Sequence, residues 1–298
     1  MDDGSMLGRA PSFLIVFTTI CSQSQQIFNK VAARKIRHFA LDLSFVSLGI
    51  RTGYLFDAFA VSGRRPAVFT DLLVSLRQAV PAFEDVIILH EPISDQLFFV
   101  NFALLEERCV QQPGYGIGHD LERQGNAEQW PNFVQLFQVP TLVRIPTQVD
   151  SLLRELRARG EKRAGLQRPV VLAITQPLVI TDSVPLAAVL LEYPVAYVPA
   201  DADQTEFLPG VLLDVYHCVI SLADTTLDDT RGAPGDAREH TLLKFSCPAC
   251  LAEQDTSLSP ARMMDRLRVS FGARLNAAEG QWSLAVRHTT EAHDRVSL

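Results

Sequence analysis

The chain has 298 residues, of which 47% are hydrophobic and 20% charged, and its 27 basic and 34 acidic residues give a formal net charge of −7. This composition is typical of a globular protein with a sizeable core. An acidic balance argues against general binding to nucleic acid or to an anionic membrane surface, although a local basic patch is compatible with it. We therefore expect a globular protein that binds no nucleic acid.

The cysteines and the N-terminus bear on the compartment. Five cysteines are too few, and odd in number, for a disulfide framework, so a reducing compartment is expected. The apolar run from Pro11 to Cys21 is similar to the apolar part of a short signal peptide. Asp2, Asp3 and the lack of a small-residue cleavage motif favour instead a first strand or the start of a buried helix. No run reaches the roughly 18–20 apolar residues of a membrane span, so we expect a soluble, cytoplasmic protein, with a signal-like N-terminus as the alternative.

The expected organisation is one domain without internal repeats or separating linkers. Residues 1–24 are expected to form an N-terminal extension, residues 25–290 a single α/β domain and residues 291–298 a tail. Within the domain, the polar and glycine-bearing segments 111–130 and 223–239 are expected to be mobile loops.

The first half of the chain predicts short strands between amphipathic helices. Apolar residues recur every three to five positions over 25–50, which indicates one long helix or two short ones. A second helix opens at Pro66, and a third runs from Thr147, a predicted cap, to Gly160. Strands are predicted at 53–61, 85–91, 96–102, 133–139 and 141–146.

The second half contains the clearest predicted unit. Residues 170–175 form a continuous apolar run, which is typical of a strand buried on both faces. A helix capped by Asp182 or Ser183 follows, and a strand begins after Pro194, so the segment predicts a βαβ unit with parallel pairing. Further strands are predicted at 212–222, 241–247 and 282–290, and an amphipathic helix at Ser259 and beyond. The predicted fold class is α/β: a mixed, largely parallel sheet flanked by helices, with some antiparallel hairpins.

Several of these segments resemble a known family. The stretches LLEYPVAYV (190–198), LPGVLLDVYHCVISL (208–222), LLKFSCPACL (242–251) and ALDLSFVSLGIRTGYLFDAF (40–59) are similar to an uncharacterised eukaryotic family whose human member is named only as an open reading frame on chromosome 1. The shared motifs are strand and helix cores, so the resemblance implies no activity. Two features depart from the family pattern: Glu192 stands where a glycine-like turn residue is expected, and the loop 223–239 looks like an insertion.

The Cys-Pro-Ala-Cys motif at Cys247 and Cys250 allows three interpretations. A redox pair requires the motif at a helix N-terminus, which lowers the thiol pKa, whereas the next predicted helix starts near Ser259. A structural zinc site requires four ligands, and His217 and Cys218 are neighbours on a strand, so they point to opposite faces. We favour unreactive thiols at a strand end and expect no metal site.

Polar residues at strand ends supply the candidate catalytic residues, because open α/β sheets place ligands there. Asp57, His90 and Glu91 are the candidates, with Asn101 and Asp182 beside them. A carboxylate and an imidazole can perform acid–base chemistry if they converge. The alternative is that Glu91 and Pro92 only form the polar approach to a hairpin.

Three other groups are expected to be solvated rather than functional. The alternating glycines at 114, 116 and 118 lack the strand, spacing and helix of a dinucleotide fingerprint. Asp201 and Asp203 are expected in a loop. The arginine-rich segment from Arg154 to Arg168 is expected on a solvated helix end, with an anion or partner site as the alternative.

Two functions stay open at this level. The first is a non-catalytic binding or scaffold protein, favoured because no recognisable nucleophile, metal set or phosphate loop occurs in the sequence. The alternative is an α/β enzyme that acts on a small molecule or nucleotide at the carboxyl ends of its strands, and fold alone cannot choose between them. The sequence identifies no cofactor, substrate or partner.

Overall fold

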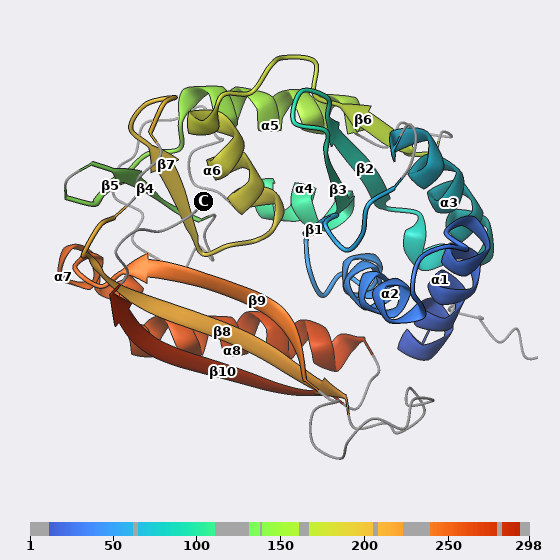
Figure 1. The fold of residues 1–298 in the computed structure, drawn as a ribbon. Helices are drawn as coiled ribbons and strands as arrows, with labels where there is room; N and C mark the ends of the chain where they lie inside the picture. The colour runs from blue at the N-terminus through green and yellow to red at the C-terminus, as the bar shows by residue number, and fades with distance from the viewer. Residues whose placement is uncertain are drawn as a thin grey trace, which may run out of the picture.

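The computed structural model describes residues 12–61, 65–110, 131–137, 139–160, 167–204, 208–222, 239–278 and 282–292. The expected loop 111–130, with its glycines, lies outside the described residues, and so does the loop 223–239 except for Glu239. The expected tail lies outside them too, except for Glu291 and Ala292, which end the last strand. Helices and mixed sheets alternate along the chain, as the α/β prediction requires (Figure 1).

The first sheet has the strand order β1-β3-β2-β6. Its strands are β1 (Gly53–Leu55), β2 (Val86–Glu91), β3 (Gln96–Asn101) and β6 (Val171–Ala173). The predicted hairpin of β2 and β3 is confirmed, and β6 pairs in parallel with β2. The predicted strand over 53–61 is shorter than expected, because the chain leaves the sheet after Leu55.

The predicted βαβ unit is present as elements but not as a pair of neighbouring strands. Helix α6 (Ile180–Leu190) connects β6 to β7 (Val195–Pro199), yet β7 pairs in parallel with β4 (Asn132–Leu136) in another sheet, ordered β5-β4-β7, in which β5 is Thr141–Val143. Each strand therefore joins the free edge of a different hairpin. The prediction that 170–175 is buried on both faces is also wrong, because β6 is an edge strand with Val171 half-buried and Ala173 exposed.

The third sheet is antiparallel, with the order β10-β8-β9. Its long strands are β8 (Leu212–Leu222), β9 (Glu239–Pro248) and β10 (Trp282–Ala292). Helix α8 (Pro260–Ala277) runs along this sheet (Figure 1). Its predicted apolar stripe is confirmed, because Met263, Leu267, Phe271 and Leu275 are buried.

The N-terminal part of the chain is a helical layer that lies beside the first sheet. It consists of α1 (Phe13–Ile27), α2 (Ala33–Ser47) and α3 (Arg65–Ala79). The apolar run that begins near Pro11 is thus helical, and Phe13, Val16 and Ile20 are buried against α2 and α3. The expected boundary at residue 24 falls inside α1, so residues 13–24 belong to the core rather than to an extension. None of the described helices has both the length and the apolarity to cross a membrane.

The expectation of a largely parallel sheet is not confirmed. Among the described residues, five of the seven strand pairs are antiparallel. Short turns favour hairpins, since antiparallel strands can be joined by a few residues whereas a parallel pair needs a crossover. The β2–β3 and β4–β5 connections are of this short kind.

The remaining helices cover the first sheet and close the ends of the strands. They are α4 (Phe102–Val110), α5 (Thr147–Gly160) and the short α7 (Leu251–Gln254), with 3-10 turns at Pro81–Phe83 and Thr256–Leu258. One face of β2, with Val86 and Ile88, packs into a core shared with α1–α3, the antiparallel sheet and α8. The other face, with Ile87 and Leu89, packs into a second core with α4, α5 and α6.

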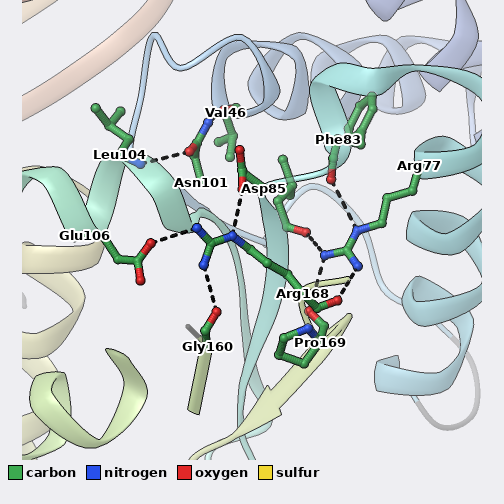
Figure 2. A network of polar contacts seen from close by, with 11 residues as sticks. Val46, Arg77, Phe83, Asp85, Asn101, Leu104, Glu106, Gly160, Arg168 and Pro169 are labelled. Carbon is green, nitrogen blue, oxygen red and sulfur yellow. Dashed lines mark hydrogen bonds and ion pairs between the residues drawn. The ribbon is translucent and has the colours of Figure 1, made fainter. Parts of the chain in front are cut away.

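Arg168 joins these elements in a polar network (Figure 2). Its guanidinium donates to Asp85 at 2.7 Å, to Glu106 at 2.7 Å and to the carbonyl oxygen of Gly160 at 2.8 Å. Arg77 donates to the backbone carbonyl oxygens of Arg168 and Phe83 nearby. The arginine-rich segment is therefore not uniformly solvated as expected: Arg168 is buried, whereas Arg154 and Arg159 pair along α5 with Asp150 and Glu155.

Replacement of Arg168 by Met should lower the free energy of unfolding by about 2 kcal/mol, because two carboxylates and a helix-end carbonyl lose their donor. The loss is smaller than for a fully buried pair, since Asp85 and Glu106 are 39% and 25% exposed and water partly replaces the cation. Urea unfolding measures the change. The control is Arg268→Met, which removes an exposed pair within α8 and should cost less than about 0.5 kcal/mol; equal losses in both variants would contradict the role of the network.

Candidate functional site

The three candidate catalytic residues occupy separate local settings. His90 lies beside Asp95 with 3.1 Å between Nε2 and Oδ1, at the end of the β2–β3 hairpin. Glu91 closes the same turn by accepting hydrogen bonds from the backbone N–H groups of Ile93 and Ser94, and these bonds lower its pKa although burial raises it. Asp57 is exposed after β1. No hydrogen bond or ion pair joins Asp57 to His90 or Glu91 among the described residues, and their catalytic role stays a prediction.

The two further candidates, Asn101 and Asp182, lie at the start of helices. Asn101 ends β3 and donates through Nδ2 to the carbonyl oxygen of Val46 on α2, while its Oδ1 accepts from Leu104 N in the first turn of α4 (Figure 2). Asn101 thus ties three elements together. Asp182 lies in the first turn of α6, where partial burial raises its pKa, and the helix begins two residues before it.

The surroundings of the cysteine motif disfavour a reactive thiol. Cys247 is buried at the end of β9, and burial together with the carboxylate of Asp214 raises its thiol pKa to about 12, so the thiolate is disfavoured. Cys250 is exposed and both thiols are free. A four-residue helix that the sequence did not predict, α7, begins directly after Cys250, and the helix predicted near Ser259 is α8, with Ser259 at its N-cap. No group of three metal-ligating side chains occurs among the described residues.

A buried carboxylate that the sequence analysis did not single out lies between α2 and β9. Asp42 Oδ1 is 3.0 Å from His240 Nε2 and 3.6 Å from Arg51 Nη1, and Asp42 Oδ2 is 3.3 Å from His38 Nδ1. The two imidazole rings are 5.0 Å apart. Burial alone raises the pKa of Asp42, but the hydrogen bonds from His240 and His38 outweigh it and lower the pKa to about 2. A carboxylate that is ionised at neutral pH therefore holds two histidines and an arginine.

One member of this cluster faces the solvent. The side chain of His38 is 65% exposed, and its hydrogen bond to Asp42 raises its pKa. Asp57 also raises the pKa of His38, so this predicted residue contributes to the cluster's electrostatic field. The signal that could have identified the cluster in the sequence is the spacing of His38 and Asp42, four residues apart on one helix face; the partnership with His240, 198 residues later, has no local signature.

A second feature is the β7–β9 cavity, which lies where the edge of β7 approaches the edge of β9. It has a volume of about 730 Å³, within the range of small-molecule sites. Most of its wall is apolar, from α6 and the facing strands: Val184, Ala187, Ala188, Leu191, Val195, Leu213, Val215 and Phe245. Tyr197 and Ser246 also line the cavity, and the Tyr197 hydroxyl donates to the Ser246 carbonyl oxygen at 3.0 Å.

The charged groups of the β7–β9 cavity stand at opposite ends. Lys244 on β9 lies opposite His217 of the central strand β8. Glu291 on β10 lies opposite Leu213 of β8. Lys244 and Glu291 are therefore four residues apart along the strands, or about 13 Å. Glu291 accepts a hydrogen bond from Thr289, while Lys244 is exposed and has no ion-pair partner in the described part of the chain.

The Asp42 cluster predicts a pH dependence of stability. Asp42 has a lowered pKa, so its stabilisation is fully present above about pH 4 and is lost as the pH falls towards 2. Asp42→Asn should unfold more easily than the wild type at pH 7, by about 2 kcal/mol. His38 has a raised pKa in the folded protein. Its contribution to the free energy of unfolding is therefore present at low pH and is lost as the pH rises past that pKa.

Urea unfolding at pH 7, 4 and 2 measures this dependence, with the exposed Asp265→Asn as the matched control. The stability gap between wild type and Asp42→Asn should shrink as the pH approaches 2. A gap that is the same at all three pH values would show that the charge of Asp42 is not what stabilises the fold. The control variant should stay within about 0.5 kcal/mol of the wild type.

Comparisons of the chain with protein-family models, with curated proteins and with solved structures found no match. The resemblance to the eukaryotic family is thus a prediction that rests on the motifs alone. The β7–β9 cavity and the Asp42 cluster each have a geometry that can hold or transform a ligand.

Proposed function

We propose that this chain is a non-catalytic binding protein whose β7–β9 cavity holds a largely apolar small molecule that carries one anionic group. The observation that carries the proposal is the cavity itself: about 730 Å³ of space with apolar walls and, at one end, a lysine without an ion-pair partner among the described residues. Sites of this size and lining usually bury most of a small ligand and orient it through a few polar groups.

The walls of the β7–β9 cavity favour a ligand with an extended apolar body. Ala187 and Ala188 leave space along α6, since neither side chain reaches far into the cavity. Each CH₂ group that leaves water for such a wall contributes about 0.8 kcal/mol. The hydrogen bond from the Tyr197 hydroxyl to β9 fixes its ring, so this part of the cavity wall is already in place before a ligand arrives.

The charge pattern favours an anionic head group at the Lys244 end. Lys244 can pair with a carboxylate or a similar group without breaking an existing ion pair in the described residues. Glu291 at the other end repels a second anionic group, which favours a molecule charged at one end only.

Three further observations fit binding better than catalysis at this cavity. Its described lining residues include no histidine and no cysteine, and the thiol of Cys247, which follows the lining residue Ser246 in the sequence, has a raised pKa. The candidates His90 and Glu91 are engaged by the β2–β3 turn.

The proposal is tested with 1-anilinonaphthalene-8-sulfonate, an apolar fluorescent anion, and with dodecanoate as the competitor. The native protein should bind one equivalent of the dye, and dodecanoate should displace it. Ala187→Phe fills the cavity from α6 and should weaken dye binding at least tenfold, whereas Ala261→Phe, on the exposed start of α8, should not. Lys244→Gln should weaken the binding of dodecanoate and leave the binding of dodecanol unchanged. Lys35→Gln is the charge-matched control and should change neither affinity.

Two outcomes would overturn this proposal. If the dye binds Ala187→Phe as tightly as the wild type, then the dye site lies elsewhere. If no dye or dodecanoate binds at conditions where near-ultraviolet circular dichroism shows native packing, the cavity does not take this class of ligand. The circular dichroism measurement matters because loosely packed states also bind the dye.

The second candidate function is acid–base catalysis at His38, which the Asp42 cluster favours. Asp42 engages Nδ1 of His38, which leaves Nε2 on the exposed side of a ring held in place by a carboxylate. An imidazole oriented in this way can accept a proton from a bound nucleophile. Such chemistry would take place on the helical layer and not at the strand ends where the sequence placed it.

Hydrolysis of 4-nitrophenyl acetate tests this alternative. If His38 acts as a base, His38→Gln should lose most of the turnover, and His217→Gln, which removes a histidine outside the cluster, should retain it. The rate should rise with pH through the raised pKa of His38. Equal turnover by wild type and His38→Gln would remove the catalytic alternative and leave the binding proposal intact.

A further inference from the structure

Glu192 has an unusual backbone and an unusual environment. Its φ of 66° lies in the left-handed region, which favours glycine, and this agrees with the glycine-like turn expected at this position. A non-glycine residue there costs about 1–2 kcal/mol. The side chain is nevertheless a buried carboxylate, 6% exposed, so other contacts must offset both the strain and the burial.

The two carboxylate oxygens of Glu192 are fully engaged. Oε2 accepts from the backbone N–H of Thr52 at 3.0 Å and from its hydroxyl at 2.9 Å. Oε1 lies 3.1 Å from Arg108 Nη1 and 2.6 Å from Arg274 Nη1. Burial alone raises the pKa of Glu192, but the two arginines outweigh it and lower the pKa below its usual value.

One carboxylate therefore holds two guanidinium groups that come from different helices, α4 and α8. Both arginines contact Glu192 through Nη1. The same atom makes a second hydrogen bond in each case: Arg108 Nη1 donates to Thr52 Oγ1 at 2.9 Å, and Arg274 Nη1 donates to the Ile50 carbonyl oxygen at 3.2 Å. The side chains of Arg108 and Arg274 are 17% and 22% exposed. Each guanidinium group therefore keeps a side that is accessible to solvent while Nη1 contacts Glu192.

Both arginines border a cavity between α4 and α8, here called the α4–α8 cavity. It has a volume of about 340 Å³ and is lined by Arg108, Arg266 and Arg274, with Glu107, Glu192 and Ser270. Three arginines against two glutamates leave a positive excess, in a chain whose formal net charge is −7. The Glu192 charge is moreover directed inward, because both its oxygens are occupied by the contacts above.

We propose that the α4–α8 cavity binds a phosphate-bearing small molecule through Arg108 and Arg274. Two guanidinium groups fixed a few ångströms apart provide paired N–H donors, and such donors match the oxygens of a phosphate group. Glu192 positions both arginines before the ligand arrives, which reduces the entropy lost on binding. Ser270 adds a hydroxyl to the same wall.

This site is independent of the β7–β9 cavity. The two cavities have no lining residue in common. Failure of one proposal therefore leaves the other unaffected, and the two can be measured in one protein sample with different probes.

The experiment is isothermal titration of the full chain with sodium pyrophosphate and with sodium sulfate, at constant ionic strength. Ala273→Glu places a negative charge on the wall of the cavity, at an exposed position of α8 that takes no part in the Glu192 contacts. It should weaken pyrophosphate binding at least tenfold. Ala261→Glu makes the same charge change at an exposed position of the same helix away from the cavity and should leave the affinity within twofold.

A second variant, Arg274→Lys, keeps the positive charge and removes the planar pair of donors; it should weaken pyrophosphate several-fold, and its melting temperature shows whether the fold survives. Absence of pyrophosphate binding to the wild type would overturn the proposal. Equal weakening of pyrophosphate binding by Ala273→Glu and Ala261→Glu would also overturn it, because the change in net charge alone would then explain the effect. Equal affinity for sulfate would show an adventitious anion site only. Dodecanoate binding should not change in Ala273→Glu.

Discussion

The saturated carboxylate of Glu192 is the interaction on which the arrangement of the chain depends. It lies at the end of α6, directly before β7, and its four contacts reach Thr52 before β1, Arg108 on α4 and Arg274 on α8. Gly53 permits this approach, because a Cβ there would lie 2.5 Å from the carbonyl oxygen of Leu190. A single buried acid thus joins four segments that are distant in sequence, and loss of any partner would leave a charge uncompensated in the core.

Two other polar clusters act in the same way at other junctions. Asp42 joins the helical layer to β9 through His240, and Arg168 joins the segment before β2 to α4 and to the end of α5. In each case a charged side chain is surrounded by two or three polar partners, of which at least one comes from an element distant in the sequence. Such clusters are costly to bury when incomplete, so they specify how the small sheets and their helices fit together more strictly than apolar contacts alone.

Both cavities arise from the same architecture. The strands of the described residues form three small sheets, and β7 at the edge of one sheet lies beside β9 at the edge of another. Where β7 approaches β9, the small side chains of α6 leave an apolar space. Between α4 and α8, the arginines and glutamates around Glu192 contribute charged groups to the wall of the other cavity. The two spaces differ in chemistry because apolar side chains form most of the wall of the β7–β9 cavity, whereas three arginines and two glutamates are among the residues that line the α4–α8 cavity.

Local patterns in the sequence determined most of the elements. The apolar stripe of α8, the β2–β3 hairpin and the order of β6, α6 and β7 follow from periodicities of 3.6 and 2 residues, which depend on neighbours a few positions away. Only the tertiary structure decided that β6 and β7 join different sheets, that residues 13–24 belong to the core, and that Asp42 meets His240 and Glu192 meets Arg108 and Arg274. These pairings are set by which edges and charges remain unpaired once the chain is packed, and sequence separations of 82 to 198 residues carry no local signal of them.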